Sequence, residues 1–222
     1  MLRWQILIAA AAAAWFLFRY LPSALLFVWP GLLRTRETSD DGSLDPEREP
    51  AMERVHKGLT ELGFARVGAI QVSPPLSAGW AELVYAAPAQ RAFADVDARG
   101  GAIAVTLLTP FEGGQAVLTS DYRRATIDRP DYLAGGLPGS DIPALWAAHR
   151  RRVEHFHPPG GEAQPWTDFS ITGRVRADEV VTAGSGRGEL RQRSAAPLMY
   201  VLLALALLTV SALQLVRQVG RG

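Results

Sequence analysis

Two long apolar segments near the ends of the chain dominate its hydrophobic pattern. The C-terminal segment, Pro197–Val216, has no charged residue in 20 positions. A helix of that length spans about 30 Å, the thickness of the hydrocarbon core of a bilayer, whereas a buried core helix rarely runs so far without a polar face. The segment therefore predicts a transmembrane helix over 197–216, followed by a short tail, 217–222. Arginines flank it on both sides: Arg191, Arg193, Arg217 and Arg221.

The N-terminal segment is longer and less regular. Trp4–Leu33 covers 30 residues, and its single charge is Arg19. A cleaved signal peptide would need a small-residue site after a short apolar stretch, but the apolar sequence continues without one. We predict an uncleaved anchor within residues 1–33, as one tilted or kinked span over about 3–29, because Pro22 can bend a helix. A re-entrant hairpin is the alternative.

The composition changes between the two anchors. Residues 34–50 carry three Arg and six acidic residues, and residues 183–196 are rich in Gly, Ser and Arg. Both are predicted to be solvated linkers. The remaining stretch, 51–182, has the size of one ordinary domain and holds 13 basic and 15 acidic residues, a net charge of −2. The positive charge of the chain therefore lies at the ends that flank the membrane.

The pattern within this domain changes from helical to alternating. A first helix is predicted from Pro50 to Gly63, where a left-handed residue commonly ends a helix. Its apolar residues recur at helical spacing: Met52, Val55, Leu59 and Leu62. Short β-like segments follow at 64–72, 80–86, 91–97, 102–109, 115–120 and 122–127. Gly- or Pro-bearing turns separate them, which indicates hairpins, and the turns leave no room for the crossover helices of parallel pairing.

A second helix is predicted from Asp141, which can cap it, with Pro143 in its first turn. Its apolar face contains Ile142, Leu145, Trp146, His149, Val153 and Phe156. Segments 169–176 and 179–182 add a last strand or wrap the surface. We therefore predict an α+β domain, an antiparallel β-meander of about five or six strands covered by two amphipathic helices, with a transmembrane helix before and after it.

Composition and motifs exclude several kinds of chemistry. The 222 residues include 23 Lys and Arg, 22 Asp and Glu, and no cysteine, which excludes thiol catalysis, cysteine zinc sites and disulfides. A net charge of +1 gives no reason to expect nucleic-acid binding. Asp95 and Asp97 begin a segment like a calcium loop, but Arg99 and Thr106 occupy ligand positions, so we interpret both acids as strand-end residues. No catalytic residue and no cofactor is predicted.

The end of the second helix holds the densest cluster of titratable side chains. His149 is in phase with Leu145, which is typical of a core or boundary histidine. His155 and His157 form a His-x-His pair that is a candidate zinc site if the chain is extended there. The third ligand would come from Glu154, Glu162 or Asp168. Alternatively, the pair simply complements the negative end of the helix dipole.

Four arginines are candidate contacts with lipid or with a partner protein. Arg150, Arg151 and Arg152 form a short basic run, which is either a solvated face or a surface for anionic headgroups or an acidic partner. Arg19 lies within the N-terminal anchor, where a charge is costly. It is either a tolerated anchor residue that reaches the interface or a contact with a neighbouring membrane protein.

Arginines next to the anchors predict which side the domain occupies. Five flank the middle of the chain and three flank the outer ends of the anchors, which favours a cytoplasmic location for residues 34–196. The five are Arg34, Arg36, Arg187, Arg191 and Arg193, and the three are Arg3, Arg217 and Arg221.

Our leading hypothesis is a non-enzymatic protein of the cell membrane. It has two spans, the lipid bilayer and other membrane proteins as partners, and a domain that acts as an adaptor, a sensor or a subunit of a membrane complex. The alternatives are an enzyme or metal-dependent domain centred on the 141–157 helix, and a domain that senses anionic lipid.

Overall fold

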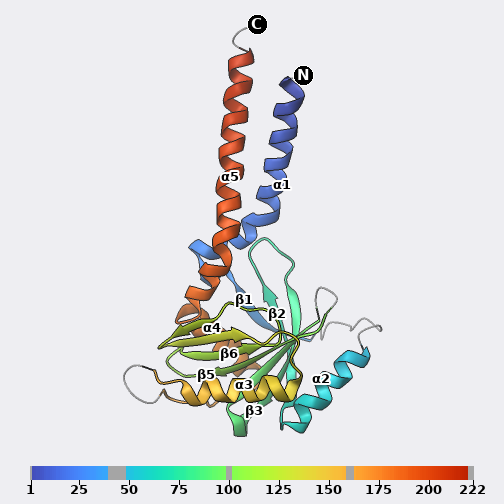
Figure 1. Cartoon of the computed structure of the whole chain (residues 1–222), viewed down its shortest axis with the longest axis vertical. Helices are drawn as coiled ribbons and strands as arrows, with labels where there is room; N and C mark the ends of the chain where they lie inside the picture. The colour runs from blue at the N-terminus through green and yellow to red at the C-terminus, as the bar shows by residue number, and fades with distance from the viewer. Residues whose placement is uncertain (1, 40–48, 99–101, 159–162, 220–222) are drawn as a thin grey trace. The chain divides into compact units, whose positions relative to one another are not determined.

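The computed structural model describes residues 2–39, 49–98, 102–158 and 163–219 (Figure 1). The chain divides into two compact units. The first contains Met1–Leu33, Pro74–Ser77 and Gly188–Gly222, and the second contains Arg34–Ser73 and Ala78–Arg187. The second unit carries the sheet and the three α-helices α2 (Glu49–Glu61), α3 (Ile142–His155) and α4 (Ile171–Ala183).

The first unit is built on two helices that are long and apolar enough to cross a membrane. Helix α1 (Leu2–Val28) is one continuous helix of 27 residues with Pro22 inside it, and the short helix η1 (Pro30–Leu32) follows. The N-terminal segment is thus a single helix, as we favoured, and not a hairpin. Helix α5 (Arg187–Val219) has 33 residues, which corresponds to a length of about 50 Å, so it exceeds the hydrocarbon core of a bilayer.

Aromatic side chains join these two helices. The ring of Tyr200 in α5 lies 4.9 Å from that of Tyr20 and 6.2 Å from that of Phe16, both in α1. Other large apolar side chains of the two helices point outward, and Phe18 and Met199 are 85% and 67% exposed. Apolar surface of this extent is typical of a segment that lipid or another protein covers.

The two predicted linkers are regular structure where the structure describes them. Arg34–Thr38 forms strand β1, so the linker prediction for 34–50 was wrong at its start; residues 40–48 lie outside the described part. The strand forms because its backbone pairs in register with the neighbouring strand, with Thr35 opposite Val72. The charged residues of β1 resemble a linker in sequence, but they suit an edge strand.

The second predicted linker, 183–196, was also wrong. Helix α5 begins at Arg187, after a turn at Gly184–Gly186, and continues into the apolar segment without a break. The charged first turns are stabilised by an ion pair between Glu189 and Arg193, whose atoms lie 3.0 Å apart at helical spacing. The predicted span, 197–216, is therefore the second part of a longer helix.

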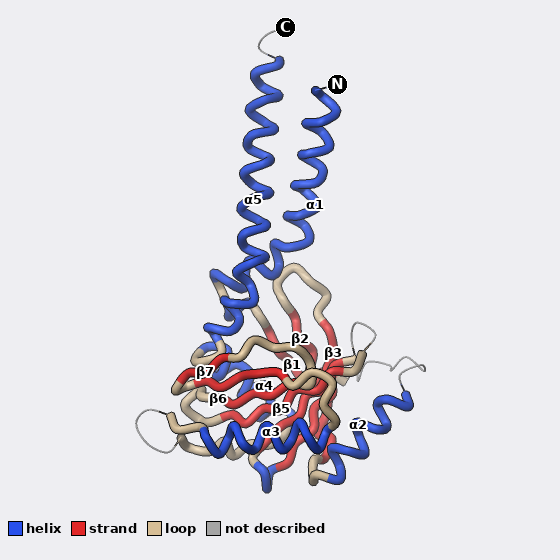
Figure 2. The backbone as a smooth tube through the Cα atoms, in the orientation of Figure 1, coloured by secondary structure: helices blue, strands red, loops and turns tan. Residues whose placement is uncertain are grey.

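The second unit contains one eight-stranded sheet in the order β1-β2-β3-β4-β5-β6-β8-β7 (Figure 2). The remaining strands are β2 (Ala65–Ser73), β3 (Trp80–Ala87), β4 (Ala92–Asp97), β5 (Ala104–Pro110), β6 (Ala116–Ser120), β7 (Ile127–Arg129) and β8 (Tyr132–Gly136). The five β-like segments between 64 and 120 are confirmed as strands. The sheet has more strands than predicted, because β1, β7 and β8 were not recognised.

The sheet departs from a pure antiparallel meander at one place. Strand β7 turns back into β8, and β8 inserts between β7 and β6, so that β6 and β8 run parallel with Thr119 opposite Gly135. The predicted strand at 122–127 is therefore wrong except at its last residue. A parallel pair was excluded for lack of a crossover helix, but β7 and its flanking loops provide the crossover.

One face of the sheet carries the main apolar core. Helices α2 (Glu49–Glu61) and α3 (Ile142–His155) cover it, and both predicted amphipathic helices are confirmed. Leu59 and Leu145 are fully buried against alternate residues of the strands, such as Tyr85 and Ala94. Gly63 ends the first of these helices with φ of +84°, as its position predicts.

The opposite face of the sheet is covered as well, which the sequence analysis did not foresee. Residues that we expected to add a strand or wrap the surface form helix α4 (Ile171–Ala183), which contacts β1 and β2. Ser170 caps this helix by accepting a hydrogen bond from the backbone N–H of Gly173 at 3.0 Å. Next to it, the ring of Phe169 packs 5.1 Å from that of Phe93.

Candidate functional site

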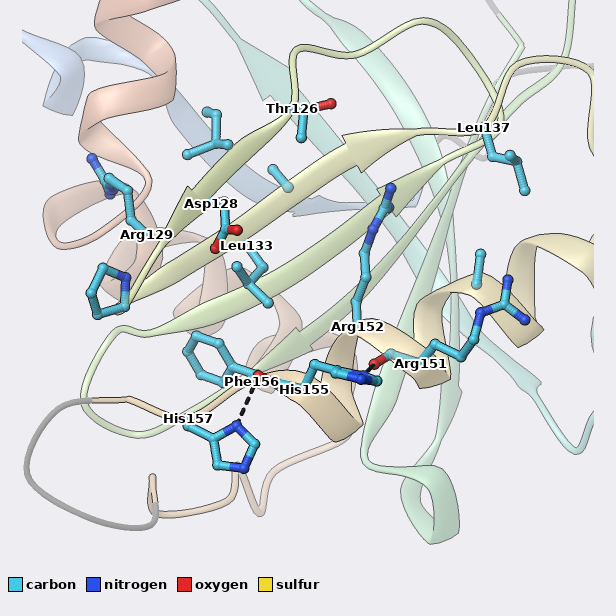
Figure 3. A pocket seen from close by; sticks show the side chains of 14 residues that line it. Thr126, Asp128, Arg129, Leu133, Leu137, Arg151, Arg152, His155, Phe156 and His157 are labelled. Atoms are coloured by element: carbon cyan, nitrogen blue, oxygen red, sulfur yellow. Dashed lines mark hydrogen bonds between the residues drawn. The ribbon is translucent and has the colours of Figure 1, made fainter.

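A groove of about 890 Å³ lies beside the C-terminal half of α3 in the sheet unit (Figure 3). Strands β7 and β8 form its other side. Its lining residues are Thr126, Ile127, Asp128, Arg129, Pro130, Leu133, Ala134, Leu137, Ala148, Arg151, Arg152, His155, Phe156 and His157. The groove therefore contains four of the residues that the sequence singled out: Arg151, Arg152, His155 and His157.

Local interactions at both ends of α3 position this groove. Asp141 accepts a hydrogen bond from the backbone N–H of Ala144 at 2.8 Å, which confirms it as the N-cap. The helix ends at His155, and the next residue, Phe156, is extended. The Phe156 ring is buried and stacks 5.2 Å from that of Phe111, so the chain leaves the helix in a fixed direction.

Arg152 is the most constrained cation of the groove. It is half-buried, and its Nη1 donates hydrogen bonds to Thr119 Oγ1 at 2.9 Å and to the carbonyl oxygen of Gly135 at 3.0 Å. Burial and the nearby charge of Arg124 lower the pKa of its guanidinium group. Among the residues that the structure describes, no carboxylate pairs with Arg152. The sheet thus holds this cation mainly by neutral acceptors.

The three consecutive arginines do not form one surface. Arg150 is exposed and pairs with Glu154 across 3.4 Å, away from the groove. Arg151 is exposed and lines the groove, whereas Arg152 reaches into the sheet. Successive helical residues point about 100° apart, so the run is split over three environments. A continuous basic surface for lipid headgroups is therefore not what α3 presents.

The histidine pair lies at the mouth of the groove. His155 Nδ1 lies 2.6 Å from the carbonyl oxygen of Arg151, and His157 Nδ1 lies 2.8 Å from that of His155 (Figure 3). A carbonyl only accepts, so both Nδ1 atoms are the protonated ones, and both Nε2 atoms remain for other contacts.

The predicted third metal ligands are not gathered around this pair. Glu154 pairs with Arg150, and Asp168 accepts hydrogen bonds from the backbone and hydroxyl of Ser170, which lower its pKa. Glu162 lies outside the described residues. Within the described ranges, no group of three or more histidine and acidic side chains is arranged to hold a metal ion.

His149 is a core residue, as its phase in the helix predicts. It is fully buried, with Nε2 2.9 Å from Thr109 Oγ1 and Nδ1 3.1 Å from Thr119 Oγ1. Burial, together with the charge of Arg152, lowers its pKa to about 3. The imidazole is therefore neutral at pH 7, and both of its nitrogens are occupied. A smaller cavity of about 340 Å³ lies next to it, lined also by Trp146 and Arg150.

A buried charge cluster on the α4 face was missed by the sequence analysis. Arg174 in α4 contacts both carboxylate oxygens of Asp95 in β4, and its Nη1 lies 3.7 Å from Asp178, which accepts a hydrogen bond from Thr35. Half-buried Glu82 lies next to this cluster. Burial and the charge of Asp95 raise the pKa of Glu82 to about 7. One signal was present in the sequence, since an acid within an otherwise apolar strand needs a buried partner.

Arg19 lies in the helical unit. Its side chain is exposed on α1, with the guanidinium carbon 5.6 Å from the centre of the Tyr20 ring. A cation over an aromatic ring is a favourable contact, and it offsets part of the cost of a charge in an apolar helix.

Comparisons of the chain with protein-family models, curated proteins and solved structures found no match.

Proposed function

We propose that the chain is a two-span protein of the cell membrane whose α+β unit is a recognition domain. It acts as an adaptor, a sensor or a subunit of a membrane complex, and the groove beside α3 is its recognition surface. Two helices long and apolar enough to cross a bilayer support the first part. The groove supports the second, because binding sites are concave, largely apolar and provided with a few polar groups.

One observation carries the recognition role. Among the described residues of the sheet unit, Leu137 is the one large apolar side chain that is more than about a third exposed, at 38%, and it lines the groove. The other large exposed apolar residues belong to the helical unit. A concave groove that combines apolar surface with a few charged groups is typical of a binding site.

The surroundings of α3 favour recognition over catalysis. A general base needs a free nitrogen or oxygen within reach of a substrate. His149 is the histidine with the strongly shifted pKa, but Thr109 and Thr119 occupy both of its ring nitrogens inside the core. The groove histidines, His155 and His157, keep Nε2 for other contacts, but their Nδ1 atoms bind backbone carbonyls, and among the described residues no carboxylate orients either ring and no nucleophile is hydrogen-bonded to it.

We further propose that the recognition domain faces the cytoplasm. The excess of arginines beside the domain, five against three, supports this orientation. A reporter fused after Gly222 tests it, since a two-span protein with a cytoplasmic domain has both termini outside the cytoplasm. Activity of a periplasmic or extracellular reporter is expected, and a cytoplasmic reporter signal overturns the orientation.

A groove-filling substitution tests the recognition role. Ala148 lines the groove, and the exposed Ala147 on the same helix does not, so Ala148→Trp and Ala147→Trp are a matched pair. The full chain, extracted in lipid nanodiscs, is analysed by native mass spectrometry for stoichiometric bound components. We expect a component that Ala148→Trp loses and Ala147→Trp retains. If both variants retain the bound component equally, or if the unmodified chain has no bound component, the recognition role of the groove is contradicted.

A further inference from the structure

The environment of Arg152 indicates what kind of ligand the groove takes. Its Nη1 makes three contacts with neutral acceptors, whereas its Nε and Nη2 have no acceptor among the described residues. Gly135 leaves the space for this side chain, since a Cβ there would lie 2.5 Å from Nη2. Partial burial of a guanidinium group without a carboxylate partner costs desolvation free energy. An anion that reaches the group offsets this cost by forming charge-assisted hydrogen bonds.

Most of the other charges of the groove are positive as well. Arg129 and Arg151 also line it, and Asp128 is its one acidic residue. Arg129 is engaged elsewhere, by Asp131 at 3.3 Å and by the carbonyl oxygen of Ser185. Even with Arg129 set aside, the two remaining arginines outweigh Asp128, so the potential of the groove favours an anion.

The rest of the groove is apolar. Leu133 and Leu137 lie on the sheet side, and the buried Phe156 lies at the end of α3. Figure 3 shows Leu133 between the side chains of Asp128 and Arg152, which approach the cavity from β7 and α3. A ligand that reaches Arg152 therefore also covers apolar surface, which excludes a bare inorganic ion as the best fit.

We propose that the groove binds an anionic molecule with an apolar body, whose phosphate or carboxylate group contacts Arg152 and whose body packs on Leu133 and Phe156. This inference rests on the proposed recognition role, because it names the ligand class of the same groove. A soluble organic phosphate and a lipid headgroup with its attached glycerol share this chemistry. Arg152 is then the main anion contact, and Asp128 limits the charge that the groove accepts.

Phenyl phosphate is a suitable probe because it combines one anionic group with one apolar ring. Its dissociation constant is measured by isothermal titration calorimetry on the full chain in phosphatidylcholine nanodiscs. Benzyl alcohol supplies the ring without the charge, and inorganic phosphate supplies the charge without the ring. We expect phenyl phosphate to bind below about 1 mM and both controls at least about tenfold more weakly.

Substitutions at two groove residues locate the probe. Arg152→Gln is expected to weaken phenyl phosphate binding by about tenfold or more, because a charge-assisted hydrogen bond is lost. Asp128→Asn is expected to tighten it roughly threefold, because an exposed like charge is removed. Asp128 is exposed and makes no contact that the fold needs, so this variant remains informative if Arg152→Gln does not fold.

Matched controls come from the far side of α3. Arg150→Gln and Glu154→Gln remove one positive and one negative charge, as Arg152→Gln and Asp128→Asn do, but these residues line the smaller cavity. Neither is expected to alter the affinity beyond about twofold at a salt concentration of about 0.3 M, where distant charges are screened. A second arm adds phosphatidylglycerol to the nanodiscs. Competition with phenyl phosphate then identifies a lipid headgroup as the source, and no competition identifies a soluble molecule; both outcomes support the anion site.

Two results overturn the proposal. One is phenyl phosphate binding no tighter than benzyl alcohol, and the other is an affinity that neither Arg152→Gln nor Asp128→Asn changes. If either occurs while Ala148→Trp still removes the bound component from the native chain, the recognition role stands and the ligand class is wrong. If Ala148→Trp also has no effect, the recognition role fails as well.

Discussion

The guanidinium group of Arg174 contacts both carboxylate oxygens of Asp95, with Nε 2.9 Å from Oδ1 and Nη2 2.6 Å from Oδ2. Both side chains are almost completely buried between α4 and the sheet. Asp178 adds a second negative charge at 3.7 Å, and its hydrogen bond from Thr35 connects β1 to the same cluster. The strand that follows α1 and the helix that precedes α5 are thereby joined through one buried cation.

Removal of one partner of this pair is expected to be strongly destabilising. Arg174→Met leaves Asp95 as a buried charge without a counterion, and the loss should be about 3–5 kcal/mol. The double variant Asp95→Leu with Arg174→Met should recover much of it, because no buried charge remains. Urea unfolding of the full chain in detergent, followed by circular dichroism, measures both. As a control, Arg150→Met breaks an exposed pair and should lower the free energy of unfolding by less than about 1 kcal/mol. If Arg174→Met lowers it by no more than Arg150→Met does, the expectation is contradicted.

Glu82 makes stability fall as the pH rises. Burial and the charge of Asp95 raise its pKa from 4.5 to about 7, so between these values the folded chain keeps a proton that the unfolded chain releases. Its contribution is fully present below pH 4.5 and is lost as the pH rises to about 7. Glu82→Gln should remove this dependence and raise stability at pH 8 by roughly 1–3 kcal/mol. Unfolding free energies at pH 5 and pH 8 test it, and an identical pH slope in the variant would refute the role of Glu82.

His149 has the opposite effect. Its folded pKa of about 3 lies below the ordinary value of 6.5, so the unfolded chain takes up a proton first as the pH falls. The contribution of His149 to the free energy of unfolding is complete above pH 6.5 and is lost as the pH falls towards 3. The size of the pKa shift corresponds to a loss on the order of several kcal/mol. His149→Phe should lose this acid sensitivity, while at every pH Thr109 loses its contact with the imidazole and Thr119 keeps only its hydrogen bond from Arg152. The chain with His149 and the chain with His149→Phe are compared in a Glu82→Gln background, because the pH ranges over which Glu82 and His149 act overlap. Acid sensitivity that survives His149→Phe assigns the effect to other groups.

The strands were predictable where apolar and polar residues alternate along the chain. The predictions were wrong where polar residues point into the core. The predicted strand at 80–86 agrees with β3 to within one residue. Strand β1 was taken for a linker because its charges dominate its composition, although Thr35 is its buried residue. Helix α4 was missed because Arg174 occupies its buried face, and the pairing with Asp95 that makes this possible comes from a strand 79 residues away. No local pattern reports such a pair.

The site was predictable in part. The sequence indicated α3 and its histidines, but it treated three arginines as one surface. Arg152 follows Leu145 by seven residues and His149 by three, so the helical period already places it on the buried face. The other side of the groove was not predictable, because it depends on the insertion of β8 between β6 and β7, and residue patterns do not encode that strand order.

Gly135 offers a separate test of how Arg152 is held. A Cβ at this position would meet Arg152 Nη2 at 2.5 Å and Cζ at 3.0 Å, so Gly135→Ala forces the guanidinium group to move. We expect a loss of about 1–2 kcal/mol in unfolding free energy, because the hydrogen bonds of Nη1 to Thr119 and to the backbone are displaced. In the Arg152→Met background the same substitution should cost little, since the shorter side chain leaves the space. A double-mutant cycle on the full chain measures this coupling, and additive losses would show that Gly135 does not determine the position of Arg152.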